Sequence, residues 1–249
     1  MAIAELRRKI REAAPKEPVA LIGTSGRAPT PEETRGTAIL FAQIFSEPPW
    51  GEVSRCEGCG AFSEQRASQG CHCSTCGTGV LVPAYPVEQM IRHIDAIASR
   101  RDASLHIIKE DGIQGFGWGY PRDVADFIGS SIPYKSQRRA IKEVLCAMNG
   151  GSNIAFGAEE VGVRPEFRGR GAGKFLISKL VEDGQRQGRI SLVWTRWDAV
   201  LAPICLNFGY TQVYGPEMCL REGGFELTGQ ILVGTHPRMS ERVLFAAPR

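Results

Sequence analysis

Four cysteines between residues 56 and 77 occur in two copies of the pattern Cys-x-x-Cys-Gly. The copies are Cys56-Glu-Gly-Cys59-Gly and Cys73-Ser-Thr-Cys76-Gly, with thirteen residues between Cys59 and Cys73. A two-residue spacer lets both thiolates face one point, and the following glycine permits a turn in which backbone amides reach the sulfurs. Four thiolates close a tetrahedral shell and leave no position for water. The spacing therefore predicts a structural zinc site rather than a catalytic one.

Two neighbouring residues offer alternative ligands to this site. Cys71-His72-Cys73 permits a slipped register in which Cys71 or His72 joins the site, although the repeated glycine favours Cys73. Chance clustering of unligated cysteines is the alternative to a metal site, but it would not repeat a paired spacing. The pattern resembles a zinc ribbon, a module that often binds nucleic acid or protein, and spacing alone does not assign that role.

A glycine-rich stretch, VGVRPEFRGRGAGKFL at residues 161–176, has the composition of an anion-binding loop. A strand-like run leads to Pro165, and three glycines then open an amphipathic helix. Without a Cβ, glycine lets backbone N–H groups approach a phosphate, and the helix N-terminus adds a partial positive charge. The loop lacks the lysine-hydroxyl ending of a P-loop and has no clear acidic partner for a ribose. We predict phosphate binding here, with a purely structural turn as the alternative.

The elements that position these groups follow from the period of the apolar residues. A Glu-Asp-Gly sequence at 110–112 between two strand-like runs predicts a hairpin. The expected helices cover about 3–14, 31–45, 87–98, 137–148, 172–185 and 199–207. The expected strands cover about 104–109, 113–120, 154–163, 190–195, 211–220 and 243–246.

Composition narrows the possible partners and compartment. The 249 residues are 43% hydrophobic and 23% charged, which is normal for a globular chain with a sizeable core. A net charge of +3 is too mild to support a nucleic-acid or membrane partner, so nucleic acid stays possible but without support from charge. The charged N-terminus does not resemble a secretory signal, and no window approaches a membrane span. We expect a cytoplasmic protein, whose reduced thiols favour metal over disulfides.

The glycine loop resembles the Arg/Gln-x-x-Gly-x-Gly/Ala signature of the GNAT superfamily of acyl-CoA-dependent N-acyltransferases. Arg168, Gly171 and Gly173 match it. The resemblance extends less specifically to the first helix, to GIQGFGWGY as the third strand and to DAVLAPICLNFGY as a later helix. It implies a mixed α/β fold with a centrally splayed sheet flanked by helices. We expect a helical extension at 1–32 and a GNAT-like domain at 33–249, which a zinc-ribbon insertion at 53–83 interrupts.

The resemblance also implies roles for individual residues. Backbone groups of Val161 and Val163 would pair with the pantetheine arm and direct the acyl carbonyl into a gap between the fourth and fifth strands. Asp198 occupies the place of a frequent asparagine, although a helix N-cap is its plainer role. The amides that would hold the pyrophosphate of acyl-CoA follow Arg168 and belong to Gly169, Arg170, Gly171, Ala172, Gly173 and Lys174.

Amine acylation needs a base for the amine, donors for the oxyanion and an acid for the departing thiolate. Glu159 and Glu160 lie on the strand expected to line the cleft, and they must face opposite sides because strand residues alternate. Glu159 shares the parity of Val161 and Val163 and is the first candidate base, with a solvated surface carboxylate as the alternative. The family's frequent tyrosine falls here on Cys205. Cys205 could protonate the thiolate, hold an acyl group or pack, and we favour packing.

The sequence therefore predicts an acyltransferase that uses acetyl-CoA, or another acyl-CoA, to acylate an amine by direct attack. The acceptor is a small molecule or a protein. Structural zinc would fold the inserted segment, which has too few apolar residues for its own core. One alternative is a nucleic-acid- or protein-binding zinc ribbon joined to a core that senses acyl-CoA. Another is S-acyl transfer to a carrier thiol, or decarboxylation of a malonyl-type thioester.

Overall fold

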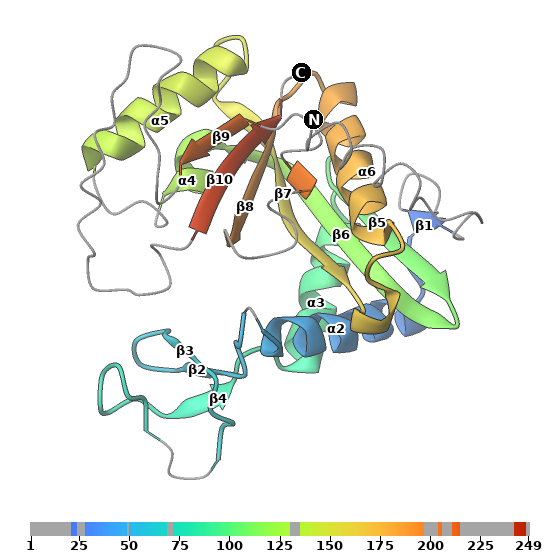
Figure 1. Ribbon diagram of the computed structural model, residues 1–249, viewed down its shortest axis with the longest axis vertical. Coiled ribbons are helices and arrows are strands. Elements are labelled where there is room, and N and C mark those ends of the chain that lie inside the picture. The colour runs from blue at the N-terminus through green and yellow to red at the C-terminus, as the bar shows by residue number, and fades with distance from the viewer. Residues whose placement is uncertain are drawn as a thin grey trace, which may run out of the picture. The chain divides into compact units, whose positions relative to one another are not determined.

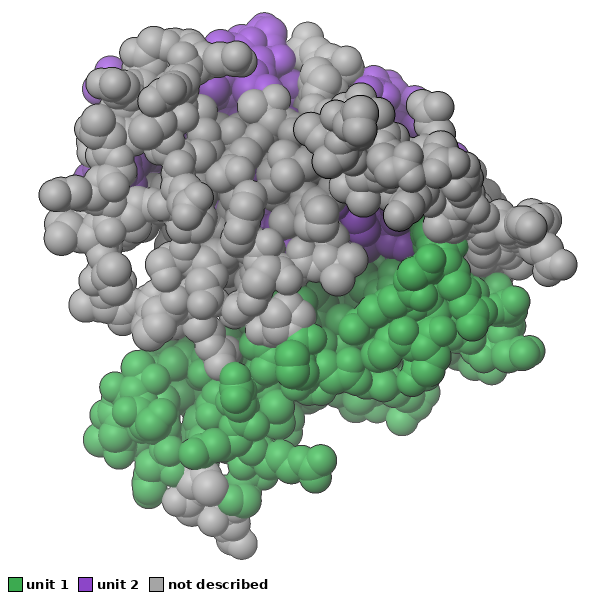
Figure 2. Space-filling model, viewed as in Figure 1, with its two compact units in different colours: residues 1–101, 105–116, 162–172 green, residues 102–104, 117–161, 173–249 purple. Residues whose placement is uncertain are grey.

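The computed structural model describes residues 21–23, 28–48, 50–68, 72–129, 135–196, 204–205, 211–214 and 242–247. Several sequence-based predictions lie outside these residues, among them the helix at 3–14, Cys71, Asp198 and most of the helix at 199–207. The chain divides into two compact units, which Figure 2 colours separately. Unit 1 comprises residues 1–101, 105–116 and 162–172, and unit 2 comprises residues 102–104, 117–161 and 173–249.

The fold is the mixed α/β arrangement that the resemblance predicted, built on one large and one small sheet (Figure 1). The large sheet has the strand order β1-β5-β6-β7-β8-β10-β9, and the small sheet has the order β3-β2-β4. Strand β7 pairs with β8 in parallel, whereas the β1/β5, β8/β10 and β9/β10 pairs are antiparallel. The strands of the large sheet are β1 Leu21–Gly23, β5 Ser104–Glu110, β6 Gly112–Asp123, β7 Ile154–Val163, β8 Ser191–Arg196, β9 Thr211–Tyr214 and β10 Arg242–Ala247.

Among its described residues, unit 1 contains two α-helices, α2 Pro31–Ser46 and α3 Val87–Ala98, close to the two predicted spans. Helix α2 begins in a capping box, because the Thr30 hydroxyl accepts a hydrogen bond from the Glu33 amide and the Glu33 carboxylate accepts one from the Thr30 amide. Polar pairs join α2 to α3, including an ion pair of 3.0 Å between Arg35 and Glu88.

The small sheet forms in the predicted insertion between α2 and α3. Its strands are β2 Ser54–Cys56, β3 Phe62–Ser63 and β4 Leu81–Pro83. Aromatic rings fix this segment to the end of α2. The Tyr85 ring lies 4.9 Å from that of Phe41, 5.8 Å from that of Phe45 and 5.9 Å from that of Phe62.

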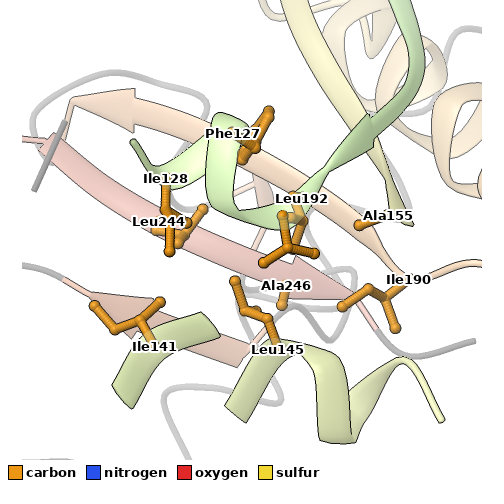
Figure 3. Packing of buried hydrophobic residues seen from close by; sticks show 10 residues of the cluster. Phe127, Ile128, Ile141, Leu145, Ala155, Ile190, Leu192, Leu244 and Ala246 are labelled. Atoms are coloured by element: carbon orange, nitrogen blue, oxygen red, sulfur yellow. The ribbon is translucent and has the colours of Figure 1, made fainter. Parts of the chain in front are cut away.

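Unit 2 holds helices α4 Val124–Ile128 and α5 Lys135–Met148, together with α6 Ala172–Arg186 from its second residue onward. Alternate side chains of β7 enter two hydrophobic clusters. Ala155 packs with α4 and α5, whereas Phe156 and Ala158 pack with α6. Helices therefore cover both faces of this part of the sheet. The cluster on the α4 and α5 side, drawn in Figure 3, consists of Val124, Phe127, Ile128, Ile141, Leu145, Ala155, Ile190, Leu192, Leu244 and Ala246.

Helix α4 and strand β1 were not expected from the sequence. Helix α4 has five residues, too few for an apolar stripe to recur, and Asp123 caps it by accepting a hydrogen bond from the Ala125 amide at 2.7 Å. In the described part of the chain, no helix combines the length and apolarity that a membrane span requires.

Candidate functional site

The four cysteines of the two Cys-x-x-Cys-Gly copies converge on one point in unit 1. Their sulfur atoms all lie within 4.8 Å of one another, with Sγ to Sγ distances of 3.7 Å for Cys56 to Cys76 and for Cys59 to Cys73. A tetrahedral zinc ion with Zn–S bonds of about 2.3 Å needs sulfur separations of about 3.8 Å. These two pairs match this value, and all four sulfurs lie close enough together for one metal ion to contact them.

The surroundings of the cluster define its ligand set. In the described residues, the metal-ligand grouping contains the four cysteines and no histidine or carboxylate. His72 lies outside the grouping and forms a β-bridge with Val80. His72 as an alternative ligand is thus not part of this arrangement. Cys71 lies outside the described residues.

Both cysteine turns have the geometry that the spacing predicted. Gly60 and Gly77 adopt φ of 74° and 73°, a left-handed conformation that glycine adopts without steric cost. The Cys59 amide donates to Cys56 Sγ at 3.4 Å, and the Thr75 amide donates to Cys73 Sγ at 3.3 Å. Backbone hydrogen bonds from Cys76 and Thr75 lower the pKa of the Cys73 thiol.

A third glycine, Gly79, lies directly against the sulfur atoms of the cluster. Backbone hydrogen bonds from Thr78 and Gly79 lower the pKa of the Cys76 thiol to about 6, so that this ligand is largely deprotonated at neutral pH. A Cβ placed on Gly79 would lie 2.1 Å from Cys56 Sγ. Only glycine fits at this position, because the backbone passes directly against the sulfurs.

The glycine loop connects β7 to α6 through a short 3-10 turn at Pro165–Phe167. Gly169 and Gly171 have φ of 76° and 86°, and α6 begins at Ala172. Residues 168–170 are exposed. Two left-handed glycines directly before a helix N-terminus are the backbone arrangement that anion-binding loops use.

The arginines of this loop contact the protein itself. Arg168 donates through Nε to the Val163 carbonyl oxygen at 3.1 Å, and its Nη2 lies 3.7 Å from Glu47 Oε2. The Arg170 guanidinium lies 4.9 Å from the centre of the Phe167 ring. Both side chains hold the loop in place, and the backbone stays exposed beside them.

Strands β7 and β8 are paired along only part of their length. The pairs are Phe156 with Ser191, Gly157 with Leu192 and Ala158 with Val193. Strand β7 continues to residue 163 and β8 to residue 196, yet the described pairs of the two strands end at Ala158. The two strands thus diverge, as the GNAT resemblance implied. Glu159 is the first residue of β7 after the last pair.

The side-chain alternation of β7 shifts by one residue just past this point. A Cβ on Gly157 would lie 2.8 Å from the Phe127 ring and 2.9 Å from Glu159 Oε1, so residues 157 and 159 share the α4 face. Strict alternation would place Val161 there too, but Val161 packs with Ala158 in the cluster of α6. Glu159 and Val161 therefore differ in face, contrary to the parity expected from sequence.

Glu159 is paired with a residue that the sequence did not indicate. Arg122, near the end of β6, donates through Nη1 to both carboxylate oxygens of Glu159, at 3.1 and 3.3 Å. The Arg122 guanidinium also lies 5.7 Å from the centre of the Phe127 ring. The side chains are 32% and 20% exposed respectively, so both remain accessible to a small ligand.

The other two candidate catalytic residues have different surroundings. Glu160 is half-buried. Cys205 is fully buried among Phe156, Ile177 and Leu180. Burial raises the pKa of the Cys205 thiol to about 12. A thiol in this environment stays protonated at neutral pH, as expected of a packing residue.

Comparisons with known proteins agree with this fold. Residues 80–200 match the family described as Acetyltransferase (GNAT) family. The structure of a polyamine N-acetyltransferase from Drosophila melanogaster, which catalyses the formation of N-acetylagmatine, covers 92% of this chain and 100% of its own, with a TM-score of 0.50 and 13% identity. A mosquito arylalkylamine N-acetyltransferase like 5b covers the same shares with a TM-score of 0.50 and 11% identity. At these identities the likeness concerns the fold. The search of curated protein sequences found no match.

Proposed function

Because residues 80–200 belong to the acetyltransferase (GNAT) family, we propose that the protein transfers an acetyl group from acetyl-CoA to an amine. The observation that carries this proposal is the loop at 168–171, largely exposed, in which two left-handed glycines lead into α6. Its amides, from Gly169 to Lys174, would bind the pyrophosphate of the cofactor. The similar folds of two amine N-acetyltransferases support an amine as acceptor.

We place the reaction where the pairing of β7 with β8 ends. Past Ala158, β7 has no described pair with β8, so backbone groups of Val161 and Val163 are candidates to bind the pantetheine arm. The Val163 carbonyl oxygen already accepts a hydrogen bond from Arg168, which leaves its amide as the more available group. The thioester carbonyl would then lie where the two strands diverge.

Glu159 is our candidate for the group that accepts the amine proton. The amine nitrogen attacks the acetyl carbonyl carbon, the carbon–sulfur bond breaks, and the CoA thiolate leaves and takes up a proton. A carboxylate beside the diverging strands could remove the ammonium proton directly or through one water. Arg122 fixes the orientation of that carboxylate through its two contacts at 3.1 and 3.3 Å.

Cys205 does not suit the role of acid in this reaction. Its pKa of about 12 lies above that of an ordinary thiol, so proton transfer from Cys205 to a departing thiolate would be unfavourable. Water or the released amine proton could protonate the thiolate instead. We therefore assign Cys205 to the hydrophobic core of unit 2.

We further propose that the four cysteines bind structural zinc. Two of the sulfur separations, Cys56 to Cys76 and Cys59 to Cys73, are 3.7 Å and fit tetrahedral Zn–S geometry, and four thiolates leave no coordination position for a substrate. The ion would stabilise a segment whose buried cluster contains only Cys56, Ala61, Cys73 and Leu81 among the described residues.

The decisive experiment is direct detection of acetylated product. Full-length, zinc-loaded protein would be incubated with acetyl-CoA and a panel of amines that includes agmatine, arylalkylamines and lysine peptides. Mass spectrometry should be the readout, because thiol reagents that detect free CoA also react with the cysteines. Acetylated product that depends on Glu159 supports the proposal. Binding of acetyl-CoA without any product would favour the acyl-CoA-sensing alternative, and consumption of malonyl-CoA without an acceptor would favour decarboxylation.

A further inference from the structure

The C-terminal end of α2 lies beside the glycine loop in unit 1. Glu47, the C-cap residue of α2, places Oε2 3.7 Å from Nη2 of Arg168. The Glu47 carbonyl oxygen accepts hydrogen bonds from the amides of Trp50 and Gly51, each at 3.0 Å. The backbone that carries this carboxylate is therefore fixed at a tight turn.

Arg168 connects this turn to the end of β7. Its Nε donates to the Val163 carbonyl oxygen, and Nη2 of the same guanidinium lies 3.7 Å from Glu47 Oε2. Because a guanidinium is planar and rigid, these two partners together restrict its orientation. Arg168 immediately precedes Gly169, the first of the left-handed glycines, so its orientation bears directly on the loop conformation.

The four-cysteine segment is attached to the same turn. The Glu52 amide donates to the Phe45 carbonyl oxygen at 2.8 Å, and Tyr85 donates from its hydroxyl to the buried Glu52 carboxylate. The Trp50 ring lies 5.3 Å from that of Phe45. Strand β2, which ends at the ligand Cys56, begins two residues after Glu52. Ordering of the cysteine segment thus constrains the turn that presents Glu47.

From these contacts we propose that Glu47 is a positioning residue for the cofactor loop, acting through Arg168, and that metal binding by the four cysteines strengthens this contact. The inference rests on the proposed use of acyl-CoA. Metal and cofactor would then bind cooperatively. Since such coupling is reciprocal, each ligand must raise the affinity for the other by the same factor.

The direction in which Glu47→Gln changes the affinity for CoA separates a positioning role from a simple charge effect. Acyl-CoA is an anion, so removal of the negative charge in Glu47→Gln should strengthen CoA binding if Glu47 only repels the cofactor. If Glu47 orients Arg168, the same substitution should weaken binding. Partly exposed ion pairs contribute little, so we expect a rise in Kd of about two- to fivefold.

The test is a double-mutant cycle on the full, zinc-loaded chain, with CoA affinity measured by isothermal titration calorimetry. The variants are Glu47→Gln, Arg168→Gln and the double variant. If Glu47 acts through Arg168, its substitution should have no further effect in the Arg168→Gln background. Glu47→Asp, which keeps the charge, should recover part of the affinity.

Glu88→Gln is the matched control, because it also removes a carboxylate paired with an arginine on α2, namely Arg35 at 3.0 Å. We expect CoA affinity to stay unchanged in this variant. Unchanged or tighter CoA binding in Glu47→Gln, or additive losses in the cycle, would overturn the positioning role. Absence of CoA binding by the unmodified protein would instead refute the proposed function on which the inference rests.

The proposed coupling between zinc and CoA binding is tested by a separate measurement. Zinc affinity would be measured by competition with a chelator, with and without saturating CoA. We expect CoA to tighten zinc binding about two- to fivefold in the unmodified chain and to have less effect in Glu47→Gln. Equal zinc affinities with and without CoA in the unmodified chain would overturn the coupling.

Discussion

Arg122 Nη1 lies 3.1 and 3.3 Å from the two carboxylate oxygens of Glu159, one residue beyond the last β7–β8 pair. The contact joins the end of β6 to the strand expected to line the active site. A carboxylate held in this way has one orientation, and any proton it accepts must reach an oxygen that Arg122 leaves accessible. The pair should therefore act as a unit in catalysis.

We expect Glu159→Gln to lower kcat about 100-fold or more while CoA affinity stays similar, because general-base catalysis usually contributes that much. Arg122→Met should lower kcat by a smaller factor, about tenfold, since the carboxylate remains but loses its orientation. Steady-state kinetics on the best acceptor, together with CoA titrations, would measure both effects. A larger loss in Glu160→Gln than in Glu159→Gln would move the base to the other residue.

Gly171→Ala should weaken CoA binding by at least about tenfold. The φ of 86° at Gly171 disfavours any residue with a Cβ by about 1–2 kcal/mol, and relief of this strain would turn the loop amides away from the phosphate. Gly188, with φ of 65°, stands after α6, and a Cβ added there would meet open space. Gly188→Ala should therefore lower stability but leave CoA affinity unchanged. Equal CoA affinity in both variants would contradict the anion-binding role of the loop.

The four-cysteine site should bind one zinc ion per chain and lose it in Gly79→Ala. A Cβ at this position would lie 2.1 Å from Cys56 Sγ, so the sulfur must leave its place in the tetrahedron. Elemental analysis of purified protein would measure the zinc content. Cys146→Ser serves as the control, because Cys146 is half-buried in unit 2 and lies outside the cluster. Full zinc content in Gly79→Ala would contradict this geometry.

Cys205 should make the stability of the protein depend on pH in the alkaline range. The pKa is about 12 in the folded protein against an ordinary value of 9.0, so the unfolded chain loses the thiol proton first. The stabilisation is fully present below pH 9 and falls by about 1.4 kcal/mol per pH unit as the pH rises from 9 towards 12.

Denaturant unfolding of the unmodified chain and of Cys205→Ser across this pH range would measure the effect as a difference. Other groups titrate in the same range, and the comparison removes their contribution. Cys205→Ser should also retain acetyltransferase activity. A pH dependence identical in the two proteins would show that this thiol ionises as readily in the folded state as in the unfolded chain.

Helices and strands with a strong local pattern could be predicted closely from sequence. Helix α3 covers Val87–Ala98, as its apolar residues Met90, Ile91, Ile94 and Ile97 indicated, and all of these side chains except the half-buried Ile91 are buried. Strand β7 also has its predicted bounds of 154 and 163. The short strand β1 escaped prediction because three residues carry no period, and its place in the sheet depends on pairing with the distant β5.

The four-cysteine site and the Arg122–Glu159 site also differed in how well the sequence alone predicted them. All four candidate metal ligands lie within 21 consecutive residues, so their spacing alone indicated the cluster. Arg122 and Glu159 stand 37 positions apart, and only strand order brings them together. The packing of Val161 with Ala158 was not predicted either, because faces assigned from sequence assume strict alternation along a strand.

Strand β10 follows β9 in the chain but lies between β8 and β9 in the sheet. Its six pairs with β8 extend from Arg242 with Arg196 to Ala247 with Ser191. During synthesis, the edge of β8 must therefore stay open while the roughly fifty residues up to the end of β10 are added, about 3–10 s at ordinary ribosomal rates. An open edge of this kind can pair with other chains. Nascent protein in that interval is the form in which we expect chaperone dependence and aggregation to be greatest.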